Sequence, residues 1–78
     1  MTAFAVGDTI CVPEDGYRFG TGDLVLSVTE VVSRGPFEGT EWAELKGHDV
    51  RPDGTLAPRE RFAFVRVDRA RVVWVVTL

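Results

Sequence analysis

Residues 23–33, with the sequence DLVLSVTEVVS, decide the fold class of this 78-residue chain. The apolar side chains of Leu24, Leu26 and Val28 alternate with residues that would face the other way. An alternation with a period of two is typical of a β-strand that buries one face. The run is long for so small a domain. We therefore expect this strand to bend and to serve two halves of a small barrel.

Shorter segments on both sides of residues 23–33 predict four more strands. These segments are residues 9–12, 40–46, 59–67 and 71–76. Glycine and proline separate them, and we expect connections at residues 13–22, 35–39 and 47–58, with a short 3₁₀ turn at residues 68–70. No stretch shows the apolar spacing of an amphipathic helix. The chain is therefore expected to form one all-β domain over residues 1–78.

The alternation within the flanking strands predicts which side chains form the core. Ile10 and Val12 would share one face of the first strand. In the third strand, Ala43 and Leu45 are the better core candidates, which leaves Trp42 nearer the surface. A domain of this size has a thin core that uses most of its large apolar residues. We therefore expect any binding site to lie on loops and strand edges.

Composition and charge narrow the class of protein. The formal net charge is −3, which is unusual for a dedicated nucleic-acid binder. Cys11 is the only cysteine, so no internal disulfide can form, and a reducing compartment is expected. Residues 1–5 lack a basic leader pattern, and the apolar stretch at residues 72–76 is far shorter than the roughly 20 residues of a membrane helix. We expect a cytoplasmic protein without membrane contact.

Few residues could support catalysis or metal binding. Cys11 lies in the middle of a predicted strand, where a buried structural thiol is expected. His48 lies beside Asp49 in a predicted loop, and adjacent side chains seldom face each other. One cysteine and one histidine cannot supply the ligands of a zinc site. We expect no enzymatic activity, no metal and no cofactor.

The opening segment resembles a known superfamily. Residues 4–12, FAVGDTICV, are similar to the pattern F-x-V-G-D-x-V-x-V that begins several SH3-like barrels of the KOW, BAH and nitrile-hydratase β-subunit types. The strand layout resembles the same superfamily, and residues 41–45 and 51–53 are faintly similar to BAH domains. The resemblance implies a five-stranded SH3-like barrel. Its members bind peptides, modified histone tails, nucleic acids or larger enzyme subunits, so it does not choose among these ligands.

Aromatic residues in the first long connection suggest a binding surface. Tyr17 and Phe19 flank Arg18, and Trp42 on the third strand could complete an aromatic surface with them. Such a surface could dock a peptide, stack bases or hold a methylated ammonium group. The alternative is that Tyr17 and Phe19 fold back and close one end of a thin barrel. The leading hypothesis is a non-catalytic adaptor that binds a protein or peptide.

Two further hypotheses rest on the last third of the chain. Five of the nine basic residues could bind nucleic acid there: Arg59, Arg61, Arg66, Arg69 and Arg71. Residues 72–76 are apolar on both faces, although one strand of a single barrel needs only one buried face. Val73, Trp74 and Val75 could therefore contact a larger enzyme subunit or a second copy of the chain.

Overall fold

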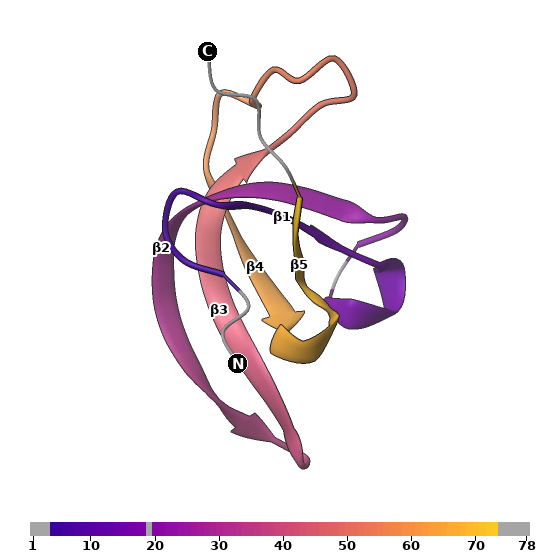
Figure 1. Cartoon of the computed structure of the whole chain (residues 1–78), viewed down its shortest axis with the longest axis vertical. Coiled ribbons are helices and arrows are strands. Elements are labelled where there is room, and N and C mark those ends of the chain that lie inside the picture. Colours follow the sequence, from indigo (N-terminus) through magenta and orange to yellow (C-terminus); the bar gives the residue numbers. More distant parts are fainter. Residues whose placement is uncertain (1–3, 19, 74–78) are drawn as a thin grey trace.

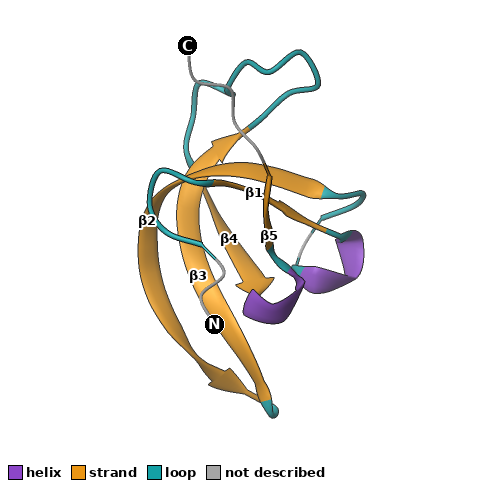
Figure 2. Cartoon of the chain, in the orientation of Figure 1, coloured by secondary structure: helices purple, strands orange, loops and turns teal. Residues whose placement is uncertain are grey.

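The protein is all-β, as the sequence predicts. The computed structural model describes residues 4–18 and 20–73, which form five strands and two short 3₁₀ turns (Figures 1 and 2). The elements are β1 (Thr9–Val12), η1 (Glu14–Gly16), β2 (Leu24–Phe37), β3 (Thr40–Asp49), β4 (Arg61–Arg66), η2 (Val67–Arg69) and β5 (Arg71–Val73). No helix in these ranges is long and apolar enough to cross a membrane.

The strands form one antiparallel sheet in the order β4-β3-β2-β1-β5. The edge strands β4 and β5 do not pair with each other in the part of the chain that the structure describes, so the sheet is open. The turn η2 leads directly from β4 into β5 and thereby connects the two edges (Figure 1). The sheet therefore curls without a closing row of backbone hydrogen bonds.

Strand β2 bends where its pairing with β3 is interrupted. The register shifts between Val28 and Glu30 and again between Val31 and Ser33. Extra residues of this kind bend a strand and increase its twist. The first part of β2 also pairs with β1, from Val12 opposite Leu24 onward, whereas β3 follows β2 to the tip of the hairpin (Figure 1). The expected bend is confirmed.

One cluster of buried side chains lies inside the curled sheet. Every strand from β1 to β4 contributes to it, and its members are Phe4, Ile10, Val12, Tyr17, Leu24, Leu26, Val28, Ala43, Leu45, Ala63, Val65 and Val67. The predicted inward faces of β1, β2 and β3 are therefore confirmed. The opposite face of β3 and β4 carries the half-buried Trp42 and Phe64 and the exposed Phe62. This outer face is the only sheet surface with several aromatic rings among the described residues.

The hairpin between β2 and β3 is tighter than expected. Strand β2 continues through Gly35 and Pro36, which lie opposite Trp42 and Glu41, so the predicted turn at residues 35–39 is too long. The turn itself consists of Glu38 and Gly39, with φ angles of 53° and 82°. Two successive positive φ angles match the right-handed twist of the flanking strands. Proline is tolerated in a strand that has one free edge. Pro36 lies on such an edge, because β1 pairs only with residues 24–27 of β2.

Three other predicted boundaries are wrong by a few residues. Strand β4 begins at Arg61, so Arg59 precedes the strand and does not share a strand face with Arg61. Strand β3 extends to Asp49 because the chain continues to pair with β2, which places His48 in a strand and not in a loop. The turn η2 begins one residue earlier than expected. Residues 74–76 of the expected last strand lie outside the described residues.

Candidate functional site

Tyr17 closes the core and is not part of an exposed surface. Its side chain is 9% exposed, and its hydroxyl donates hydrogen bonds to the carbonyl oxygens of Gly22 at 2.8 Å and Thr21 at 3.2 Å. Gly20 lies so close to the ring that a Cβ at this position would overlap it. Tyr17 therefore folds back into the domain, as the alternative hypothesis predicts, and does not belong to an exposed binding surface. Phe19, its expected companion, lies outside the described residues.

Arg18 lies on the outer side of the sheet, next to the buried Tyr17. Its backbone N–H donates to the carbonyl oxygen of Phe64 at 3.1 Å, which fixes the residue against the free edge of β4. The centre of its guanidinium group is 5.4 Å from the ring centroid of Phe37, 5.5 Å from that of Trp42 and 5.9 Å from that of Phe64. Each distance is within the range of a cation–π interaction.

The three rings around Arg18 come from three neighbouring strands, and we call them the aromatic patch (Phe37, Trp42 and Phe64). Trp42 and Phe64 stack with centroids 5.1 Å apart and an angle of 17° between their planes. Trp42 is opposite Arg66 in the register and Phe64 is opposite Glu44, so the two rings are diagonal neighbours. The strand pairing therefore builds the patch, with Phe37 at the end of β2.

Two shallow grooves flank the patch and share Phe64. One, of about 240 Å³, runs along the hairpin past Arg34, Phe37 and Trp42. The other, of about 460 Å³, runs along β4 past Arg18, Glu44 and Arg61. Phe62 also lines the second groove and is 58% exposed. The outer face thus has a groove on each side of the Phe64 ring.

The charged residues that line these grooves are three arginines and one glutamate: Arg18, Arg34, Arg61 and Glu44. Arg34 pairs with Glu41 at 3.1 Å, and Arg61 pairs with Asp49 at 3.4 Å. Within residues 4–18 and 20–73, the Arg18 side chain has neither an ion pair nor a hydrogen bond. Its neighbours there are aromatic rings, and its charge is not neutralised by a carboxylate.

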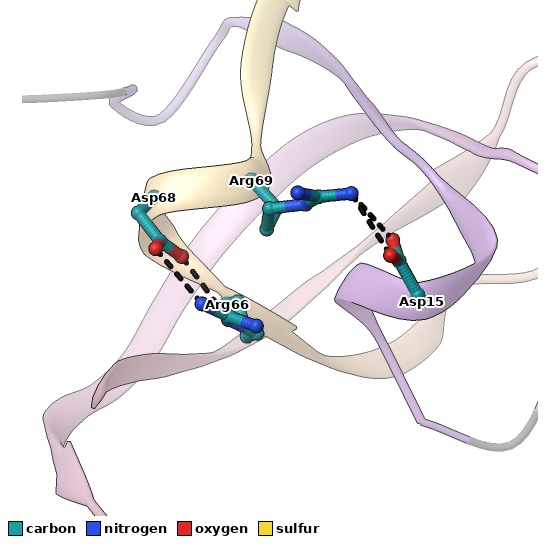
Figure 3. A network of polar contacts seen from close by, with 4 residues as sticks. All are labelled: Asp15, Arg66, Asp68 and Arg69. Carbon is teal, nitrogen blue, oxygen red and sulfur yellow. Dashed lines mark hydrogen bonds and ion pairs between the residues drawn. The ribbon is translucent and has the colours of Figure 1, made fainter. Parts of the chain in front are cut away.

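The arginines of the last third do not form one positively charged surface. Arg66 forms a two-pronged contact with Asp68 at 2.9 and 3.2 Å, and Arg69 reaches both carboxylate oxygens of Asp15 at 2.8 and 2.9 Å (Figure 3). Arg61 and Arg66 lie at opposite ends of β4.

Arg59 and Arg71 are exposed. A groove of about 330 Å³ lies beside β1. Its charged lining residues are two arginines and two aspartates, Arg69, Arg71, Asp23 and Asp68, so their charges balance. Carboxylates therefore accompany most of the arginines that the sequence singles out for nucleic-acid binding.

A polar network on the same sheet joins Thr29, Lys46 and His48 to Glu60. The Thr29 hydroxyl donates to the Glu60 carboxylate at 2.6 Å, Lys46 Nζ is 3.5 Å away, and His48 Nε2 is 3.9 Å away. The Thr29 hydrogen bond is the largest cause that lowers the pKa of Glu60, and the charge and hydrogen bond of Lys46 lower it further. His48 Nδ1 lies 2.8 Å from the carbonyl oxygen of Ala57, so the ring fastens the long connection to β3.

The remaining predicted residues have structural positions. Cys11 is a free, half-buried thiol on the outer side of β1 and is not a fully buried core residue, because Ile10 and Val12 take the inward positions. Val73 pairs with Thr9 at the β5 edge. Trp74 and Val75 lie outside the described residues, so the predicted interface is described only at Val73.

The structure thus brings Arg18 and Trp42 together and adds two rings that the sequence analysis did not assign to the site. Phe64 could have been found from the alternation in β4, because Ala63 and Val65 are the smaller inward candidates. Phe37 could not, because the glycines and proline of residues 35–39 predict a turn there. Comparison of the chain with protein-family models, curated proteins and solved structures found no match in any of the three.

Proposed function

We propose that this protein is a non-catalytic binding module that recognises a protein partner through the aromatic patch. The observation that carries the proposal is the cluster of Phe37, Trp42 and Phe64 around Arg18 on an outer sheet face. Aromatic and arginine side chains are enriched at the centres of protein interfaces. Phe37 is 43% exposed, and Trp42 and Phe64 are half-buried, so a partner can reach the patch chiefly at Phe37.

The charge distribution favours a protein over a nucleic acid. Ion pairs occupy Arg61, Arg66 and Arg69, and the chain as a whole has a net charge of −3. Affinity for nucleic acid depends on cations that can approach many phosphates. In the described part of the chain, the outer face has aromatic rings and one arginine without an ion pair, and not a row of free cations, which suits a protein surface better.

The strand order also supports the SH3-like barrel that the opening segment resembles. Consecutive antiparallel strands, a bent β2 and a 3₁₀ turn directly before the last strand are what that resemblance implies. We therefore propose that the open, curled sheet is a small barrel of this type. The proposal for the binding surface does not depend on this, because it is argued from the side chains of β2, β3 and β4.

Site-specific photo-crosslinking in cells of the source organism tests the binding function. p-Benzoylphenylalanine replaces Phe37 in the patch or, as a matched control, Leu56, which is similarly exposed at 47% in the connection between β3 and β4. We expect irradiation to join a discrete protein partner to the variant at position 37 and not to the variant at position 56. Adducts only at position 56, or none at position 37, would contradict the proposal.

A further inference from the structure

We propose that the partner presents a carboxylate beside apolar side chains, and that Arg18 receives this carboxylate while the apolar side chains seat in the grooves beside Phe64. This inference rests on the proposed binding function and names the chemistry of the partner segment. It is carried by the position of Arg18 against three rings, by its lack of a carboxylate partner among the described residues and by the position of Phe64 between two grooves.

Arg18 is held in place before any partner arrives. Its backbone N–H donates a hydrogen bond to the carbonyl oxygen of Phe64, and the centre of its guanidinium group lies within 5.9 Å of three ring centroids. The guanidinium N–H donors of Arg18 have no hydrogen-bond partner among the described residues, and a guanidinium group matches a carboxylate with two parallel hydrogen bonds. A side chain that is already ordered also loses less entropy on binding.

Arg18 is the cation of the groove lining that has no carboxylate partner among the described residues. The other charged residues of the lining are Arg34, Arg61 and Glu44. Arg34 is paired with Glu41 and Arg61 with Asp49, so their charges are already balanced within the domain. The unpaired guanidinium group of Arg18 therefore complements a carboxylate on the partner and opposes a cation.

The position of Phe64 suggests how such a segment would lie. The ring separates the groove along the hairpin from the groove along β4, and Arg18 lines the second groove next to it. An extended peptide that crosses Phe64 can therefore place apolar side chains in both grooves and an acidic side chain at Arg18. Gly35 lines the first groove, and a Cβ there would meet nothing within 4 Å, so this groove has room for a side chain.

A random peptide library displayed on phage, selected against the full chain, tests the inference. We expect the enriched sequences to share an aspartate or glutamate next to leucine, isoleucine or phenylalanine. A fluorescein-labelled synthetic copy of the most enriched sequence then measures affinity by anisotropy. Arg18→Gln should weaken binding about tenfold or more, because it removes hydrogen bonds to a charged group. Arg18→Lys should weaken it less, since it keeps the charge and loses the planar fork.

Arg66→Gln is the matched control, because Arg66 lies on the outer face opposite Trp42 but is already paired with Asp68. This change should alter the affinity by less than about twofold. Enriched peptides that lack acidic residues, yet bind with an affinity that depends on Trp42 and Phe64, would overturn the carboxylate inference and leave the binding function standing. If no peptide is enriched, or if a single-stranded oligonucleotide binds through Arg18, both proposals are overturned.

Discussion

Trp42 and Phe64 stack across neighbouring strands with ring centroids 5.1 Å apart, and Arg18 lies over both rings. The pair is set by the β3–β4 register, which makes the two residues diagonal neighbours on the outer face. Two large rings on the solvent side of a thin sheet add little to the core. They surround Arg18, a cation that has no carboxylate partner within residues 4–18 and 20–73, and the proposed function depends on this arrangement.

The contact between Arg18 and Trp42 should be measurable as a coupling energy. A double-mutant cycle with Arg18→Gln and Trp42→Leu isolates the pair, since both side chains lie on the surface. We expect a favourable coupling of about 0.5–1 kcal/mol in the free energy of unfolding by urea. A coupling of zero would show that the guanidinium group is not held against the ring in solution.

Gly47 should tolerate no side chain, whereas Gly35 should accept one. A Cβ at Gly47 would run into the carbonyl oxygen of Ser27, where β3 passes close to β2. We expect Gly47→Ala to lower the free energy of unfolding by about 1–3 kcal/mol. Gly35→Ala should change it by less than about 1 kcal/mol, because its Cβ enters open space. Equal urea midpoints for the two variants would contradict the close approach at Gly47.

The hydroxyl of Tyr17 should contribute to stability and not to binding. Tyr17→Phe keeps the buried ring and removes the hydrogen bonds to Gly22 and Thr21. We expect the free energy of unfolding to fall by about 0.5–1.5 kcal/mol. The affinity for the selected peptide should stay unchanged, because the side chain is buried. A loss of affinity with unaltered stability would assign Tyr17 to the binding surface.

Glu60 should make the fold sensitive to acid through Thr29. The pKa of Glu60 is lowered in the folded state, chiefly by the Thr29 hydroxyl. Ionised Glu60 therefore stabilises the fold above its ordinary pKa, and this contribution is lost as the pH falls through the lower, folded pKa. Thr29→Val should raise the pKa of Glu60, as followed by carboxyl ¹³C NMR. The free energy of unfolding by urea should then depend less on pH in this acid range.

Thr55→Val is a control for this titration. Thr55 lowers the pKa of Asp53 through its backbone N–H first and its hydroxyl second. The variant keeps the backbone hydrogen bond, so the pKa of Asp53 should stay below its ordinary value and that of Glu60 should not move. A shift of Glu60 in this variant would show that the Thr29 contact is not its main cause.

The all-β architecture could be predicted from the sequence because alternation and turn residues are local signals. Residues 9–12 form the predicted strand without change, and the inward faces of β2 and β3 follow the predicted alternation. The hairpin turn could not be placed, because Gly35 and Pro36 are turn formers that here remain in the ladder. The competing factor is the register with β3, which local propensity does not contain.

The candidate site could be predicted only in part because its members meet through tertiary pairing. Arg18 and Trp42 stand out as residues, but their contact depends on the Arg18 backbone bonding to β4. Tyr17 and Arg18 are neighbours in sequence, and their side chains go to opposite sides of the sheet edge. No sequence pattern shows which of the two enters the core. The hydrogen bonds of the Tyr17 hydroxyl explain why the tyrosine does.

The most direct measurement of the central claim is an NMR titration of the ¹⁵N-labelled chain with the most enriched peptide. The side-chain signals of Arg18 Nε and Trp42 Nε1 report on the patch itself, and the amide of Val72 reports on the opposite sheet edge. We predict that the Arg18 and Trp42 signals shift most, saturate together and return when the peptide is competed away. The largest shifts at Val72, with Arg18 and Trp42 unmoved, would contradict the account.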